Sequence, residues 1–183
     1  KERTTSARDF ASVAVSGIGE EQVNLVFSGH IALPLRVAVA ARPRQDGSIA
    51  LRIEVDRLGE WCLAGVRFPD APGPPALSGD GSNDRLLLPW QAGGLLPAPG
   101  QTYARRQVDY PGIVHAQFTT HYNERAGIYW ALEDGAAHCK KLYLECTPGS
   151  AVSLAFEHLV PEIPGCAFRL PYDVVVTTFQ GDW

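Results

Sequence analysis

The sequence contains no methionine, only four cysteines and no long hydrophobic run. A transmembrane helix needs about 20 consecutive apolar residues, and no stretch approaches that length, so we expect no membrane partner. Lysines and arginines number 16 against 20 acidic residues. Since no basic stripe with interleaved aromatic residues is present, we expect no nucleic-acid partner either.

The absence of methionine makes Lys1 an unusual first residue. The residues that follow resemble neither the apolar core of a signal peptide nor a transit peptide. We interpret the start as a cut within a longer protein, although cleavage of a secretion signal just upstream would look the same. The sequence therefore leaves the compartment open between secreted, periplasmic and cytoplasmic.

The cysteines are Cys62, Cys139, Cys146 and Cys166, and no two of them show C-x-x-C spacing. Four cysteines permit three pairings, and spacing selects none of them. We favour small buried hydrophobic side chains over disulfides, which would require a secreted parent. His138 with Cys139 and Cys146 lacks the fourth ligand and the close cysteine pair of a zinc site, so we predict no metal and no cofactor.

Residues alternate between apolar and polar with a period of two along much of the chain. The clearest case is residues 35–42 and 49–56, two alternating runs around Asp46-Gly47, which predict a β-hairpin. Further strands are predicted at 22–27, 115–122, 128–132, 141–145, 152–157 and 174–179. No window shows a helical apolar stripe, and 14 prolines and 18 glycines would interrupt long helices. The pattern favours an all-β antiparallel sandwich or barrel.

Residues 1–183 are predicted to form a single β-sandwich domain, as expected at this length. Within it, residues 69–101 are predicted to be a long loop, rich in proline, glycine and serine but holding an apolar centre at 86–90. Long loops in compact domains often serve binding or gating.

Self-contained catalytic motifs are missing. The sequence has no G-x-S-x-G, H-E-x-x-H or phosphate-binding G-K-[ST] pattern. Glu133 and Asp134 are neighbours, and on an extended strand they would point to opposite faces, whereas glycoside hydrolysis needs two carboxylates across one sugar. The sequence therefore offers no self-contained catalytic motif, and we predict a turn at Asp134-Gly135.

Aromatic residues in or beside loops are the most suggestive candidates for sugar contact, because exposed aromatic faces mark binding surfaces. His115 and His121 are predicted on one face of a strand, either as groove residues or as polar positions on a solvated face. We select Trp90, Tyr110, His121 and Trp130 as candidate substrate-binding residues, and core packing is the alternative for each aromatic residue.

Four phrases in order resemble a known family: "VRFPDA", "NDRLLLPWQAGGLLPAP", "YPGIVHAQFTTHYNERAGIYWALEDGAAHCKKL" and "FRLPYDVVVTTFQGDW". Their succession is similar to the N-terminal β-sandwich of large bacterial glycoside hydrolases. In this family a galactose-mutarotase-like supersandwich precedes a (β/α)8 catalytic barrel. The likeness covers residues 23–183, and its most specific parts are Asp84 to Gly93, Tyr110-Pro111-Gly112, Gly127-Ile128-Tyr129 and the final 179–183.

The resemblance implies an antiparallel two-sheet supersandwich whose parent enzyme cleaves sugars. It also implies that the catalytic carboxylates lie on a barrel in cis, outside these residues, because the active sites of such barrels lie at their strand ends. We therefore expect a non-catalytic accessory domain that supports the barrel and lends a loop to its pocket. The alternatives are an autonomous carbohydrate-binding module or, less favoured, an aldose-epimerase-like enzyme.

Overall fold

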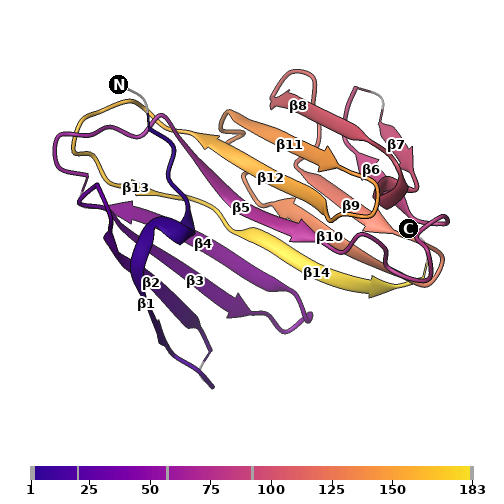
Figure 1. Ribbon diagram of the computed structural model, residues 1–183, viewed down its shortest axis with the longest axis horizontal. Helices are drawn as coiled ribbons and strands as arrows, with labels where there is room; N and C mark the ends of the chain where they lie inside the picture. The colour runs from indigo at the N-terminus through magenta and orange to yellow at the C-terminus, as the bar shows by residue number, and fades with distance from the viewer. Residues whose placement is uncertain (1–2, 20, 57, 92, 182–183) are drawn as a thin grey trace. The chain divides into compact units, whose positions relative to one another are not determined.

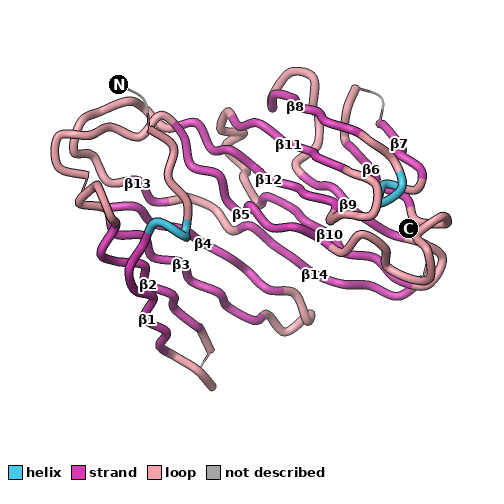
Figure 2. Tube along the Cα trace, in the orientation of Figure 1, coloured by secondary structure: helices cyan, strands magenta, loops and turns pink. Residues whose placement is uncertain are grey.

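The computed structural model describes residues 3–19, 21–56, 58–91 and 93–181, and nearly all of its regular structure is β-strand (Figures 1 and 2). The helices in this part of the chain are two short 3-10 turns, η1 (Ala7–Asp9) and η2 (Pro99–Gln101). No helix among the described residues is long and apolar enough to cross a membrane. The prediction of an all-β antiparallel fold is confirmed. The chain divides into two compact units, Lys1–Ala64 with Val160–Asp173, and Gly65–Leu159 with Val174–Trp183.

The first unit is an antiparallel sheet whose strands follow one another in chain order. Its strands are β1 (Phe10–Ser16), β2 (Val23–His30), β3 (Arg36–Pro43) and β4 (Ile49–Asp56), and the short β13 (Phe168–Arg169) pairs with β4. The predicted hairpin is β3–β4. At its turn, Gly47 has φ +82°, and the Asp46 carboxylate accepts hydrogen bonds from the Ser48 backbone (2.9 Å) and hydroxyl (2.6 Å).

Asp173 fixes the returning segment 160–173 to this hairpin. Its carboxylate accepts hydrogen bonds from the guanidinium groups of Arg42 (3.1 Å), Arg44 (2.8 Å) and Arg52. Burial alone would raise the pKa of Asp173, but the hydrogen bonds from Arg52 and Arg44 outweigh it and the pKa is lowered. The ionised carboxylate therefore connects two parts of the chain that are far apart in sequence.

The second unit is a sandwich of two antiparallel sheets. One sheet has the order β14-β10-β9-β6-β7 and the other β5-β12-β11-β8. The bounds are β5 (Gly65–Gly73), β6 (Arg85–Leu88), β7 (Gly94–Pro97), β8 (Ala104–Tyr110), β9 (Phe118–Tyr122), β10 (Ala126–Leu132), β11 (Lys140–Cys146), β12 (Val152–Leu159) and β14 (Val174–Gln180).

Alternate side chains of these strands form the core of the sandwich. On β11, Leu142, Leu144 and Cys146 are at most 4% exposed, whereas Tyr143 and Glu145 between them are not buried. The opposite sheet contributes Leu86, Trp130 and Leu132. This is the pattern that a period of two produces when one sheet face is covered by another sheet.

Residues 69–101 are not one long loop. They contain the end of β5, the β6–β7 hairpin and η2. The run Leu86–Leu88 is a strand in which Leu86 is completely buried, and the prolines and glycines lie at the ends of the short strands. Strand β5 carries Pro69 and Pro72, and a proline-containing strand is hard to predict because proline cannot donate to the ladder.

Candidate functional site

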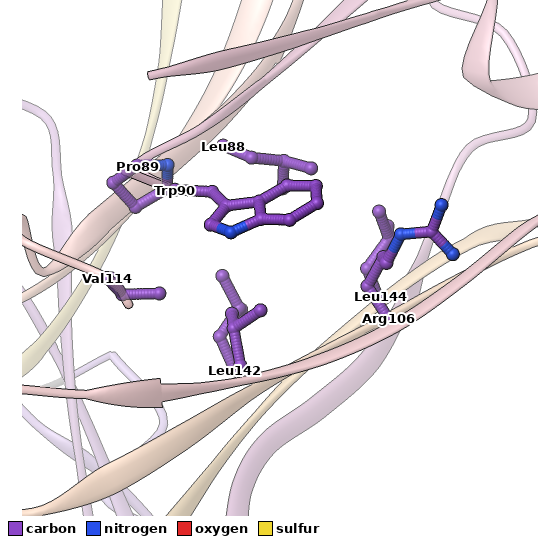
Figure 3. Close-up of a pocket in the computed structure, with 8 residues that line it drawn as sticks. Leu88, Pro89, Trp90, Arg106, Val114, Leu142 and Leu144 are labelled. Atoms are coloured by element: carbon purple, nitrogen blue, oxygen red, sulfur yellow. The ribbon is translucent and has the colours of Figure 1, made fainter. Parts of the chain in front are cut away.

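Trp90 lies over an apolar pocket within the second unit. The pocket is lined by Leu88, Pro89, Trp90, Arg106, Val108, Val114, Leu142 and Leu144 (Figure 3). The space open to the centre of a water molecule is about 10 Å³, which is room for a single water and far too little for a sugar ring. The indole Nε1–H of Trp90 is buried without a hydrogen-bond partner in the described part of the chain.

The loop that carries Trp90 is held against the segment after β8. Trp90 forms an isolated antiparallel bridge with Val114, and the Gln91 backbone N–H donates to the carbonyl of Ile113 (2.8 Å). Leu142 and Leu144 of β11 line the same pocket as the indole. Trp90 therefore packs between the two sheets, with its ring against aliphatic side chains.

Tyr110 belongs to a polar cluster around the buried Lys140 and Asp134. We call it the Lys140 cluster: Tyr110, Gln117, Asp134, His138 and Lys140. The Nζ atom of Lys140 lies 2.5 Å from Asp134 Oδ2, 2.7 Å from Gln117 Oε1 and 4.5 Å from the centre of the Tyr110 ring. Two oxygen acceptors and an aromatic face thus surround the ammonium group. The lysine, only 2% exposed, is thus held within the fold by these contacts.

Asp134 is the anion of this cluster and is only 4% exposed. It also accepts backbone hydrogen bonds from Ala136 (3.2 Å) and His138 (2.7 Å), and the His138 ring Nδ1 lies 2.7 Å from its Oδ1. Burial would raise the pKa of Asp134, but the hydrogen bonds from Lys140 and His138 lower it. For Lys140, burial is the largest effect and lowers its pKa, against the attraction of Asp134. The backbone N–H of Ala137 donates to the Asp134 carbonyl (3.2 Å), so the predicted turn at Asp134-Gly135 is present.

His121 belongs to a second buried cluster, formed with Asp84, Asn123 and Ser78. His121 Nε2 lies 3.2 Å from Asp84 Oδ2, and the Asn123 side-chain amide donates to Asp84 Oδ1 (2.7 Å) and Ser78 Oγ (3.0 Å). Asp84 Oδ2 also accepts from the Leu77 backbone N–H (2.8 Å). Burial lowers the pKa of His121 more than Asp84 raises it, so the imidazole is neutral at pH 7.

The four predicted sugar contacts thus occupy different environments. The side chains of His121 and Trp130 are 0% and 8% exposed and present no surface to a ligand in this structure. Trp90 and Tyr110 are half-buried. The predicted common strand was wrong, because His115 precedes β9 in an exposed loop, and the alternative of a solvated strand face was wrong for His121, which is completely buried. Sugar contact by the four residues stays a prediction, and the structure does not bring them together into one site.

The remaining sequence candidates are also dispersed. Cys146 is buried, but Cys62, Cys139 and Cys166 are exposed, so the expectation of buried cysteines was correct only for Cys146. Among the described residues no group of three histidine, cysteine or acidic side chains is arranged to hold a metal ion. Sequence reasoning did not select Lys140 or Asp84 as cluster residues, although Asp84 lies in one of the phrases that carried the family resemblance.

Comparison with known proteins gives a likeness of fold. No protein-family model and no curated protein sequence matches this chain. Three solved structures of an α-N-acetylgalactosaminidase from Bifidobacterium bifidum do match: its complex with Gal-NHAc-DNJ (13% identity, TM-score 0.70), its GalNAc complex (16%, 0.67) and a quadruple mutant (16%, 0.65). The matches cover 98–100% of this chain but only 29–30% of the solved chains. The chain therefore has the β-sandwich fold of a segment that makes up about 30% of this glycoside hydrolase.

Proposed function

We propose that this chain is an accessory β-sandwich domain of a glycoside hydrolase, which packs against a catalytic barrel in the same polypeptide. The fold likeness supports the proposal, because the similar solved chains are more than three times as long as the part that matches. The closed polar clusters and the very small pocket support it as well, since neither offers a place for a sugar between two carboxylates.

The observation that carries the proposal is an apolar face on the β1–β4 sheet. Opposed residues in the register place apolar side chains of all four strands side by side: Val13 and Val15 on β1, Leu25 and Phe27 on β2, Val37 and Val39 on β3, Ile53 and Val55 on β4. Only the β4 residues are buried. Val13 and Val15 are each 49% exposed, and the β2 and β3 residues are half-buried.

The second unit provides an internal comparison. There the same alternation leaves the inward side chains of β11 at 4% exposure or less, because a second sheet covers them. With four strands about 4.8 Å apart and two rows of side chains ~6.8 Å apart, the face measures roughly 260 Å². An apolar patch of a few hundred Å² on an isolated domain is often functional. In our proposal the catalytic domain covers this face.

The experiment is an activity and binding test on the 183-residue chain. We expect no hydrolysis of aryl α-N-acetylgalactosaminides and no saturable change in tryptophan fluorescence on titration with GalNAc. Turnover by the isolated chain would overturn the proposal. Saturable quenching without turnover would favour the alternative, a carbohydrate-binding module.

The apolar face is tested separately with a dye whose fluorescence rises on apolar surfaces. We expect the variant V13S/V15S to bind less 1-anilinonaphthalene-8-sulfonate than the unmodified chain. The matched control is A14S, which changes the same strand on its opposite face. Equal dye binding by all three proteins would contradict an exposed docking face.

A further inference from the structure

Two tight turns of the first unit meet through their backbones. The Trp61 N–H donates to the Leu58 carbonyl (3.1 Å) in one turn, and the Cys166 N–H donates to the Ile163 carbonyl (3.2 Å) in the other. The Gly165 N–H donates to the carbonyl of Trp61 (2.8 Å), which joins the two turns. A Cβ atom on Gly165 would lie only 2.9 Å from the carbonyl oxygen of Gly59, so the turns are in direct contact at a second point.

Each turn carries one cysteine next to this contact. Cys62 follows Trp61 and Cys166 follows Gly165, and both side chains are exposed. Because the Gly165 N–H is hydrogen-bonded to the Trp61 carbonyl, standard backbone dimensions keep the Cα atoms of the two cysteines within roughly 10 Å of each other. A disulfide needs about 4.4–6.8 Å between Cα atoms, so an adjustment of a few ångströms within two surface turns is sufficient.

No comparable pair exists in the second unit. Cys139 precedes β11 and Cys146 ends it, which separates them by about 23 Å along an extended strand. Cys146 is completely buried, and burial raises the pKa of its thiol to about 11. A thiol is a poor nucleophile when it is buried and protonated.

We propose that Cys62 and Cys166 are a site of oxidative modification. They form a disulfide with each other by thiol–disulfide exchange with a small-molecule disulfide such as oxidised glutathione. The thiolate of one cysteine attacks the small disulfide, forms a mixed disulfide and releases one small thiol. The thiolate of the other then attacks the protein sulfur of that mixed disulfide and releases the second small thiol. Two protein thiols are oxidised to one disulfide, and one small disulfide is reduced to two thiols.

The bond connects the two chain segments that build the first unit. Cys62 lies in Lys1–Ala64 and Cys166 in Val160–Asp173, so it closes a loop of about 100 residues. Cross-linking such a long loop restricts the unfolded chain strongly. We expect the oxidised form to melt roughly 5–10 °C above the reduced form.

Peptide mapping identifies the bond directly. The chain is incubated with oxidised glutathione, blocked with iodoacetamide, and digested without reduction by trypsin together with a protease that cleaves after glutamate. Cleavage after Glu60, Arg67, Glu162 and Arg169 releases residues 61–67 and 163–169, each with one cysteine. We expect these peptides to be joined, and to separate after reduction.

Three variants make the result specific. The joined peptide is expected in C139S and absent in C62S and C166S, and the rise in melting temperature should follow the same pattern. Stable mixed disulfides on Cys62 and Cys166 without a joined peptide would overturn the proposal. Joined peptides found only in a covalent dimer on a non-reducing gel would overturn it as well. This outcome is independent of whether the chain supports a catalytic domain.

Discussion

The Nε2 atom of His121 lies 3.2 Å from Oδ2 of Asp84, and neither side chain is more than 1% exposed. The same carboxylate accepts hydrogen bonds from Asn123 and from the Leu77 backbone, so it fastens the segment before β6 to β9 and to the residue that follows β9. In this structure His121 and Asp84 therefore connect three segments of the second unit.

Replacing Asp84 tests this role. We expect D84N to lower the free energy of unfolding by about 3 kcal/mol, because it leaves buried donors of Leu77 and Asn123 facing an amide. The measurement is urea unfolding followed by tryptophan fluorescence. D80N, at an exposed position four residues earlier, is the control. It should unfold at nearly the same urea concentration as the unmodified chain. Equal losses of unfolding free energy in both variants would show that the buried cluster does not contribute more to stability than an exposed aspartate.

Acid should destabilise the protein through its buried histidines. Burial lowers the pKa of His158 to about 4, and the neutral ring pairs with the carbonyl of Phe68 (2.7 Å). Since the unfolded histidine has a pKa near 6.5, the unfolded chain binds more protons between pH 6.5 and 4, and stability falls as the pH falls through this range. We expect His158 to account for about 2 kcal/mol between pH 7 and pH 5.

The measurement is the unfolding free energy at several pH values for the unmodified chain and for H158Q, which keeps an N–H donor but does not titrate. The variant should lose less stability between pH 7 and 5. His121 contributes in the same direction, because its pKa is also lowered, so some pH dependence should remain. An identical pH profile for both proteins would exclude His158 as a source.

Removing the cation of the Lys140 cluster should be costly. K140M leaves the buried Asp134 without its ammonium partner, and we expect a loss of about 3 kcal/mol or more in unfolding free energy. K141M is the matched control, since Lys141 is the next residue on β11 and is only half-buried. Similar stability of the two variants would contradict the role assigned to the cluster.

The ring of Phe179 leaves no room for a side chain at Gly127. A Cβ atom at this position of β10 would lie 2.1 Å from Phe179, the residue opposite it on β14. We expect G127A to cost about 1–3 kcal/mol through displacement of the ring, measured by thermal or urea unfolding. G135A is the control, because nothing lies within 4 Å of a Cβ at Gly135. A neutral G127A would mean that the ring moves aside freely.

Trp90 distinguishes packing from binding. Because its indole lies between Leu88 and Leu142 across the two sheets, W90A should lower the unfolding free energy by about 3 kcal/mol. W90F, which preserves much of the apolar contact, should lose clearly less. If W90A remained as stable as the unmodified chain, the indole would be free for a ligand and the binding-module alternative would gain support.

Most of the strands that the sequence predicted are those whose apolar and polar residues alternate along the chain. Leu142, Leu144 and the β3–β4 hairpin were recognisable because one face is apolar throughout. Strand β8 escaped because its residues 105–107 are polar and exposed, and β5 because Pro69 and Pro72 resemble a loop. Alternation of apolar and polar residues identifies only strands with one buried face. It does not identify a strand that is solvated or interrupted by proline.

The polar clusters lay beyond the reach of sequence patterns for a different reason. Asp84 and His121 are 37 residues apart, and Lys140 meets Gln117 from 23 residues away. The pairing of β6 with β9 brings Asp84 close to His121, whereas Lys140 on β11 reaches Gln117, which is hydrogen-bonded to Leu132 of β10. Without an assigned register, a polar residue on a strand is expected in a groove or on a solvated face, and these were the two alternatives for His121.

The interrupted course of the first unit has a consequence for biosynthesis. Strands β1–β4 leave the ribosome about 100 residues before the segment that carries Phe168 and Asp173. Until then the nascent hairpins lack both the β13 partner of β4 and the carboxylate that neutralises Arg42, Arg44 and Arg52. Newly made chains should accordingly be most prone to chaperone capture and self-association during this interval, and slowing translation after residue 64 should lengthen it.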